Sequence, residues 1–237
     1  MSAPLPPADI ARREPEFIIV AAGTSIHRFF TARYDPIYFD TSRDGRLNAP
    51  DASYGVLYAA RNATGAFAET FLRRPGRTLL DLDLLRQKAY ARLSITAELK
   101  LIKLAGSGLA VLGATAEVVH GGLPYDVPQA WSKALSTHIN ADGIAYYARH
   151  DDEALCYALF DRAGHAVREK ERVVDLDADW FWALAQALQN RLGASVSAPE
   201  IDDDQRSSSN PGQPSRGAMS DHRGGNSRRR QAAEIGL

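Results

Sequence analysis

Four side chains in the first third of the sequence are suited to binding and cleaving a charged nucleotide. Arg28 stands in the apolar run SIHRFF, and Arg46 follows the turn sequence RDG. A guanidinium group is a planar fork of donors that binds phosphate oxygens in pairs, so two of them near one pocket would suit a pyrophosphate. Tyr58 ends the run GVLY and could stack on a flat base. Glu69, further along, could stabilise a cationic transition state.

Each of these residues also has an ordinary structural explanation. Arg28 can form a salt bridge, and Arg46 can simply be exposed in its turn. Tyr58 can be a core aromatic residue whose hydroxyl lies at the edge of the core. Glu69 can pair on a helix surface with Arg73, four residues later. Residue type alone leaves both readings open.

The neighbours of Glu69 on its expected helix are small. Gly65 and Ala66 precede it by four and three residues, and Leu72 follows it by three. Residues with these spacings lie on the same helix face. We therefore expect open space beside the carboxylate, through which a ligand could reach it.

The elements that must position these side chains are short strands and a few helices. Asn62 is a plausible N-cap for the helix that carries Glu69, and Asp177 or Asp179 lies near the start of the last helix. The strands outnumber the helices and lack a regular βαβ rhythm, which favours an α+β fold over a doubly wound sheet. Strands are expected at 17–20, 24–30, 54–60, 88–95, 97–104, 143–149 and 153–160, and helices at 62–74, 127–139 and 177–192.

Composition predicts one soluble folded domain. The chain has 237 residues, of which 45% are hydrophobic and 24% charged, with a formal net charge of −1. These values give no global argument for nucleic-acid or membrane binding. Cys156 is the only cysteine, which excludes an internal disulfide framework and favours a buried, inert thiol.

The ends of the chain differ from its middle. We expect an irregular arm over 1–15, a folded domain over 16–195 and a disordered tail over 196–237, where Ser, Gly, Pro, Asp and Arg dominate. The arginines at 228–230 could touch nucleic acid, but a solvated terminal run is the simpler reading. No apolar run is long enough for a secretory signal or a membrane span, so a cytoplasmic protein with no membrane partner is expected.

Four familiar motifs are not met by the sequence. The run GSGLAVLG at 106–113 has Val111 where a dinucleotide fingerprint needs its third glycine, and Ala114 where a phosphate loop needs lysine. A glycine-rich turn is expected there instead. The run RHDDE at 149–153 places its polar side chains in different directions, so no metal site is expected. No G-x-S-x-G sequence supports a hydrolase triad.

The order of the four residues resembles that of a known family. Arg28 comes first, then Gly45 and Arg46, then VLYAA leading into a helix that contains Glu69. Downstream, TAEVVHGG at 115–122 precedes a helix and the run DGIAYYARHDDEALCYALF. Over roughly 17–180 this series resembles the RES-domain family, which comprises bacterial toxins that consume NAD.

The resemblance implies a fold and a set of roles. The fold would be akin to ADP-ribosyltransferases, with small, mostly antiparallel sheets and flanking helices forming a cleft for NAD. Arg28 and Arg46 would hold the phosphates or ribose of NAD, Tyr58 would line the nicotinamide pocket and Glu69 would be catalytic, with Arg28 and Tyr58 assisting. NAD would be a substrate rather than a cofactor, and phosphate a possible co-substrate.

The resemblance also implies a reaction and a partner. The protein would cleave the nicotinamide–ribose bond as an NAD phosphorylase or glycohydrolase. Alternatively it would transfer ADP-ribose to a macromolecule. Family members are usually silenced by a helix-turn-helix antitoxin of the Xre type. Nucleic acid would then be contacted only through the antitoxin complex.

One position departs from the family pattern. The family's serine is expected in the strand GIAYYAR, and the matching residue of the NAD site is Ala148. Alanine offers no side-chain hydrogen bond, so a neighbour must supply the contact. Tyr147, Arg149 and Ser136 are the candidates. A catalytically weak nucleotide-binding module is the remaining alternative.

Overall fold

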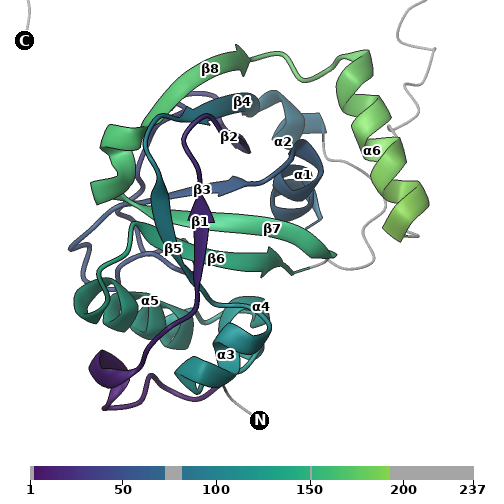
Figure 1. The fold of residues 1–237 in the computed structure, drawn as a ribbon. Helices are drawn as coiled ribbons and strands as arrows, with labels where there is room; N and C mark the ends of the chain where they lie inside the picture. Colours follow the sequence, from purple (N-terminus) through teal and green to yellow (C-terminus); the bar gives the residue numbers. More distant parts are fainter. Residues whose placement is uncertain (1–2, 73–81, 150, 193–237) are drawn as a thin grey trace, which may run out of the picture. The chain divides into compact units, whose positions relative to one another are not determined.

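The structure is a computed structural model that describes residues 3–72, 82–149 and 151–192. One eight-stranded sheet in the order β1-β5-β6-β7-β3-β2-β4-β8 organises this part of the chain, and only β5 and β6 run parallel. The α+β fold class expected from the sequence is confirmed (Figure 1). The strands are β1 (Phe17–Val20), β2 (Ser25–Thr31), β3 (Val56–Ala60), β4 (Lys88–Ile95), β5 (Leu99–Lys103), β6 (Gly143–Ala148), β7 (Asp151–Phe160) and β8 (Val167–Val173). The helices are η1 (Ile10–Arg12), α1 (Ala63–Phe71), α2 (Leu82–Arg86), α3 (Ser107–Leu112), α4 (Glu117–His120), α5 (Asp126–His138), η2 (Asp161–Ala166) and α6 (Asp179–Leu192).

The sheet divides between β2 and β3. Strand β2 pairs with β4 at every position from Ser25 to Thr31, but it pairs with β3 only where His27 faces Ala60. Figure 1 shows β2, β4 and β8 gathered together, separate from β5, β6 and β7. Beyond the single His27–Ala60 pair the two strands diverge, so no neighbouring strand fills the space between them. This divergence provides the space for the site.

Helices α1, α5 and α6 pack on one face of the sheet. Trp131 from α5, Phe67 from α1 and Phe181 from α6 are fully buried in the core between helices and sheet. The other face carries a second core, built mostly from strand side chains such as Leu57 and Leu93. Burial of apolar surface on both faces fixes the strand register, because a slip by one residue would move the side chains of each face to the opposite face.

Helix α1 is fastened to the sheet at its first turn. The Asn62 side chain accepts a hydrogen bond from the Gly65 amide at 2.8 Å, so the predicted N-cap is confirmed. A Cβ atom at Gly65 would lie 3.2 Å from the methyl groups of Ala60 and Ala154. Gly65 is therefore a close helix–sheet contact, and the open space expected beside Glu69 does not come from it.

Several elements differ from the sequence-based expectations, among them the unexpected short helices α2 and α4. Strand β8 was not expected, because its sequence VREKERV is largely charged and exposed, which suits an edge strand. The run 106–113, expected to be a turn, contains the short helix α3, which Gly113 ends with a left-handed φ of 74°. The acidic residues Asp151 and Asp152, expected in a turn, already belong to β7.

The N-terminal arm packs against the domain. Ile10 is buried, and the Trp131 indole N–H donates to the Pro4 carbonyl at 2.7 Å. The Lys103 ammonium lies 2.7 Å from the Glu16 carboxylate. The expected tail over 196–237, together with Arg73 and His150, lies outside the described residues.

Candidate functional site

A cavity of about 670 Å³ lies at the divergence of β2 and β3. Its lining includes Arg28, Arg46, Tyr58 and Glu69, so the structure brings together four of the five residues selected from the sequence. The fifth, Ala148, is fully buried and does not line the cavity. The volume is within the range of pockets that enclose a nucleotide-sized ligand.

Arg28 enters the cavity from β2. One terminal nitrogen of its guanidinium donates to the Pro36 carbonyl at 3.1 Å and to the Tyr38 carbonyl at 3.4 Å. Its Nε atom is buried and has no hydrogen-bond partner among the described residues. Burial lowers the pKa of Arg28 to about 10, opposed by the nearby Asp40 and Asp35 charges, so the group stays cationic at neutral pH.

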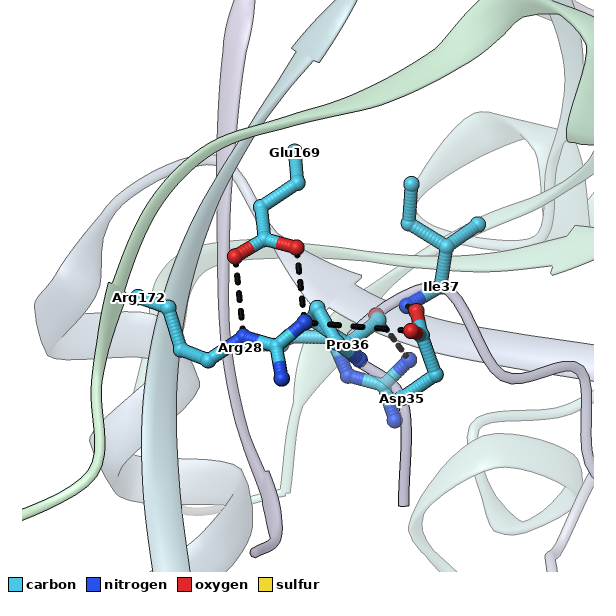
Figure 2. Close-up of polar contacts among 6 residues, drawn as sticks. All are labelled: Arg28, Asp35, Pro36, Ile37, Glu169 and Arg172. Atoms are coloured by element: carbon cyan, nitrogen blue, oxygen red, sulfur yellow. Dashed lines mark hydrogen bonds and ion pairs between the residues drawn. The ribbon is translucent and has the colours of Figure 1, made fainter.

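The segment that Arg28 holds is tied a second time from β8. Asp35 accepts a hydrogen bond from the Ile37 amide at 2.8 Å and faces the Arg172 guanidinium at 3.7 Å. Arg172 is itself paired with Glu169 at 2.7 Å (Figure 2). Segment 35–38 is therefore fixed against both β2 and β8.

Arg46 also lines the cavity, from the loop before β3. Its guanidinium lies 5.5 Å from the centre of the Tyr125 ring, a cation–π contact. Like Arg28, it has a buried Nε atom with no hydrogen-bond partner among the described residues. Two buried, charged N–H donors of this kind favour an anionic acceptor, because an unsatisfied buried donor is costly.

The Tyr58 hydroxyl holds the Arg46 loop in place. It accepts a hydrogen bond from the Leu47 amide at 2.8 Å and donates to the Asn48 side-chain oxygen at 2.9 Å. Burial raises the pKa of Tyr58, so the hydroxyl remains a donor. A Cβ atom at Gly45 would lie 2.8 Å from this hydroxyl and overlap the Asn48 amide. The glycine of the Gly45–Arg46 pair is thus required by close approach.

Asn48 and Gln129 complete the support of that loop. The fully buried Asn48 amide donates to the Asp40 carboxylate at 2.9 Å and to the Ser42 carbonyl at 2.8 Å. Gln129, on α5, donates to the carbonyls of Arg43 and Gly45. The sequence analysis missed both residues, since a lone Asn or Gln carries no spacing pattern.

Glu69 is held at the cavity by two donors from the end of β6. The Arg149 amide donates to one carboxylate oxygen at 3.0 Å, and the Tyr146 hydroxyl donates to the other at 3.3 Å. Burial, reinforced by the Glu69 charge, raises the pKa of Tyr146 well above its ordinary value, so this hydroxyl stays protonated. The carboxylate is consequently oriented by groups that cannot compete with it for a proton.

The three neighbours considered as substitutes for the missing serine have different places. Arg149 lines the cavity and contacts Glu69 through its main chain. The Tyr147 carbonyl faces His120, and Ser136 accepts hydrogen bonds from Arg162. Tyr146, which the sequence analysis did not consider, supplies a side-chain hydroxyl that donates to Glu69. The expected surface pair of Glu69 with Arg73 lies outside the described residues.

The charge of the cavity favours an anionic ligand. Five Lys or Arg residues and three Asp or Glu residues line it, an excess of two positive charges. The cations are Arg28, Arg33, Arg46, Lys88 and Arg149, and the acids are Asp40, Asp44 and Glu69. No cluster of His, Cys, Asp or Glu suited to a metal ion occurs among the described residues. Of the helices in that part of the chain, none is long and apolar enough to cross a membrane.

Comparison with known proteins places the chain in a family. No curated protein matches the sequence. A solved structure, the M. tuberculosis MbcT–MbcA toxin–antitoxin complex, contains a similar fold, with a TM-score of 0.57 and 15% identity over 71% of this chain and 92% of that one. The family model described as the RES domain matches residues 25–181, which include the whole cavity wall from Arg28 to Arg149. This match spans most of the sequence, and the chain belongs to the RES-domain family.

Proposed function

We propose that this protein is a toxin that degrades NAD by cleaving its nicotinamide–ribose bond, with Glu69 as the catalytic carboxylate. The observation that carries the proposal is the convergence in one cavity of an oriented carboxylate with two buried arginine N–H donors that have no partner among the described residues. NAD contains a pyrophosphate, which suits the two arginines. It also contains a cationic nicotinamide ring bonded to ribose, which suits the carboxylate. Arg28 and Arg46 would bind the phosphates or ribose, and Tyr58 would line the nicotinamide pocket.

The chemistry follows from the charge of the leaving group. The nitrogen–carbon bond between nicotinamide and ribose breaks, and its electron pair leaves with nicotinamide, which departs neutral. The ribose becomes oxocarbenium-like, and the Glu69 carboxylate stabilises the positive charge at its anomeric carbon. A phosphate or water oxygen then forms the new bond to that carbon, and an attacking water gives up a proton. No strong general acid is needed.

The position of Ala148 does not remove a necessary contact under this proposal. The Arg149 amide and the Tyr146 hydroxyl already orient Glu69. The excess positive charge of the cavity supports phosphate as a co-substrate, because a second anion must enter after NAD has bound. The reaction would then be phosphorolysis when phosphate is present and hydrolysis when phosphate is absent.

The fold is similar to that of a chain in a toxin–antitoxin complex, which supports an antitoxin as the partner of this protein. We propose a helix-turn-helix antitoxin of the Xre type, with nucleic acid contacted only through that complex, and a cytoplasmic location where NAD is abundant. Co-expression with a helix-turn-helix protein encoded next to this one should relieve growth inhibition caused by the protein alone. If growth inhibition is not relieved, the proposed antitoxin partner is wrong, but the proposed cleavage of NAD is unaffected.

The proposed reaction is tested by incubating the purified protein with NAD, with and without phosphate, and measuring released nicotinamide. We expect release in both cases, with ADP-ribose 1-phosphate as a product only when phosphate is present. Labelled adenine attached to a macromolecule would instead indicate ADP-ribose transfer. NAD binding without any release would indicate a non-catalytic module.

The role of Glu69 is tested by Glu69→Gln, which keeps the size of the side chain and removes its charge. We expect the rate to fall at least about 100-fold, because removal of one transition-state contact typically costs that much. Glu98→Gln is the matched control, since Glu98 is exposed and does not line the cavity. Full activity of Glu69→Gln would rule out its catalytic role.

A further inference from the structure

Two tyrosines stand stacked in the wall of the cavity. The rings of Tyr34 and Tyr38 lie 4.8 Å apart between centroids and are inclined by only 6°. Both line the cavity, yet they are 41% and 38% exposed, which places them among the most exposed large apolar side chains described. Single exposed aromatic residues are common. A parallel pair in a cavity wall is a stacking surface that a flat ligand can extend.

The pair is held rigidly by contacts outside its own rings. Arg28 donates to the Tyr38 carbonyl, and the ion pair between Asp35 and Arg172 ties the same segment to β8 (Figure 2). The Arg33 guanidinium covers Tyr34, with its carbon 4.8 Å from the ring centre and a nitrogen 2.9 Å from the hydroxyl. A surface fixed in this way loses little conformational entropy when a ligand binds.

Tyr38 is the member of the pair that remains available. Among the described residues it makes no ring or cation contact other than the one with Tyr34. Arg33 already covers Tyr34, so a third flat group would extend the stack on the Tyr38 side. The ligand base would then be the third ring of the stack, after Tyr34 and Tyr38.

The alternation of side chains along β2 separates this surface from Glu69. Phe29 packs against Phe67 and Phe71 of α1, so its neighbour Arg28 points to the opposite face of the strand. Arg28 and Tyr38 thus occupy the side of the cavity away from α1, the helix that carries Glu69. A ligand whose reacting bond is at Glu69 extends toward Tyr38 with its far end.

We propose that Tyr38, backed by Tyr34, stacks on the adenine of NAD and makes the protein specific for the dinucleotide. The inference rests on the proposed function, because it requires the nicotinamide to lie at Glu69. Arg28 links the two parts, since it lines the cavity while its terminal nitrogen holds the Tyr38 backbone. The cation Arg33 beside the stack favours neutral adenine over the positively charged nicotinamide ring.

The test measures binding of ADP-ribose, which has the adenine and both phosphates but no nicotinamide, by calorimetry on the full chain. Tyr38→Ala should weaken this binding about 5- to 150-fold, the range for loss of one base–aromatic stack. Tyr38→Phe keeps the ring and should retain the affinity. Ribose 5-phosphate, which lacks the base, should bind wild type and Tyr38→Ala alike.

Several outcomes would overturn the assignment. Equal ADP-ribose binding by wild type and Tyr38→Ala would do so, as would an equally large loss in Tyr38→Phe. Weakened binding of nicotinamide mononucleotide, with ADP-ribose binding unchanged, would reverse the orientation. An unchanged urea midpoint for Tyr38→Ala verifies that the variant is folded, and the KM for NAD in nicotinamide release should rise in parallel with the loss of ADP-ribose affinity.

Failure of this inference is distinguishable from failure of the proposed function. A protein that releases nicotinamide from NAD with the same KM after Tyr38→Ala refutes the adenine surface alone. A protein that binds ADP-ribose through Tyr38 and releases no nicotinamide refutes the catalytic proposal alone. If wild type neither binds ADP-ribose nor cleaves NAD, both are wrong.

Discussion

The Tyr58 hydroxyl provides a sharp test of how the site is held together. Tyr58→Phe keeps the aromatic ring and deletes one oxygen. That oxygen pairs with the Leu47 amide and the Asn48 side-chain oxygen, both on residues that are at most 1% exposed. The change therefore leaves one buried donor and one buried acceptor without this partner.

The expected cost follows from these two groups. Each buried polar group left unsatisfied costs about 1–3 kcal/mol, and the adjoining cavity lets water recover part of it, so the free energy of unfolding should fall by about 2–4 kcal/mol. With a urea m-value of about 2 kcal/mol/M, the midpoint should fall by about 1–2 M at unchanged m. The KM for NAD should rise more than kcat falls, because Arg46 is on the loosened loop.

The control and the refuting result are equally specific. Tyr38→Phe removes a hydroxyl that has no hydrogen bond among the described residues, so its urea midpoint should match that of wild type. If Tyr58→Phe shifts the midpoint by less than about 0.3 M, equivalent to about 0.6 kcal/mol, the hydroxyl does not hold the loop. In that case Tyr58 acts through its ring alone, as the sequence first suggested.

Three further predictions concern other groups. Gly45→Ala should lower both the urea midpoint and NAD cleavage, since its methyl group would lie 2.8 Å from the Tyr58 hydroxyl and overlap Asn48; a stable, active variant would contradict this packing. Cys156 should not react with a thiol reagent at pH 8 until urea unfolds the protein, because burial raises the pKa of its thiol; prompt native labelling would be inconsistent with that burial. Burial also lowers the pKa of His27 below its ordinary 6.5, so near this pH the native state binds fewer protons than the unfolded state. The contribution of His27 to stability is therefore complete above pH 6.5 and decreases as the pH falls from 6.5 through the folded pKa. His27→Gln should show a flatter dependence of unfolding free energy between pH 5 and 7.5, and an identical dependence would exclude this contribution.

The sequence was informative where chemistry and local pattern agree. Asn62 marked the start of α1 because a capping side chain acts within its own turn. The order of Arg28, Arg46, Tyr58 and Glu69 anticipated a shared cavity, because that order already resembled a family pattern. Their roles in catalysis remain predictions.

Other parts of the site depend on contacts between distant segments. The divergence of β2 from β3 is a matter of strand pairing that no local pattern reports. Tyr34 and Tyr38 occur in an irregular stretch, where nothing in the spacing shows that their rings stack. Tyr146 was passed over in favour of its neighbours, because alternation along β6 gives the face of a side chain only when the position of α1 is known.

Strand β1 has a practical consequence for anyone shortening the protein to the region that the family model matches. The family match begins at residue 25, after β1 has ended, yet β1 pairs with β5 from Phe17 to Val20. A fragment starting at residue 25 would uncover the hydrogen-bonding edge of β5 and the apolar surface beneath Val20 and Ile10. Such an open edge recruits strands from other molecules and leads to aggregation. The folding unit is therefore longer than the homology unit, and failure of the shorter fragment would say nothing about the proposed activity.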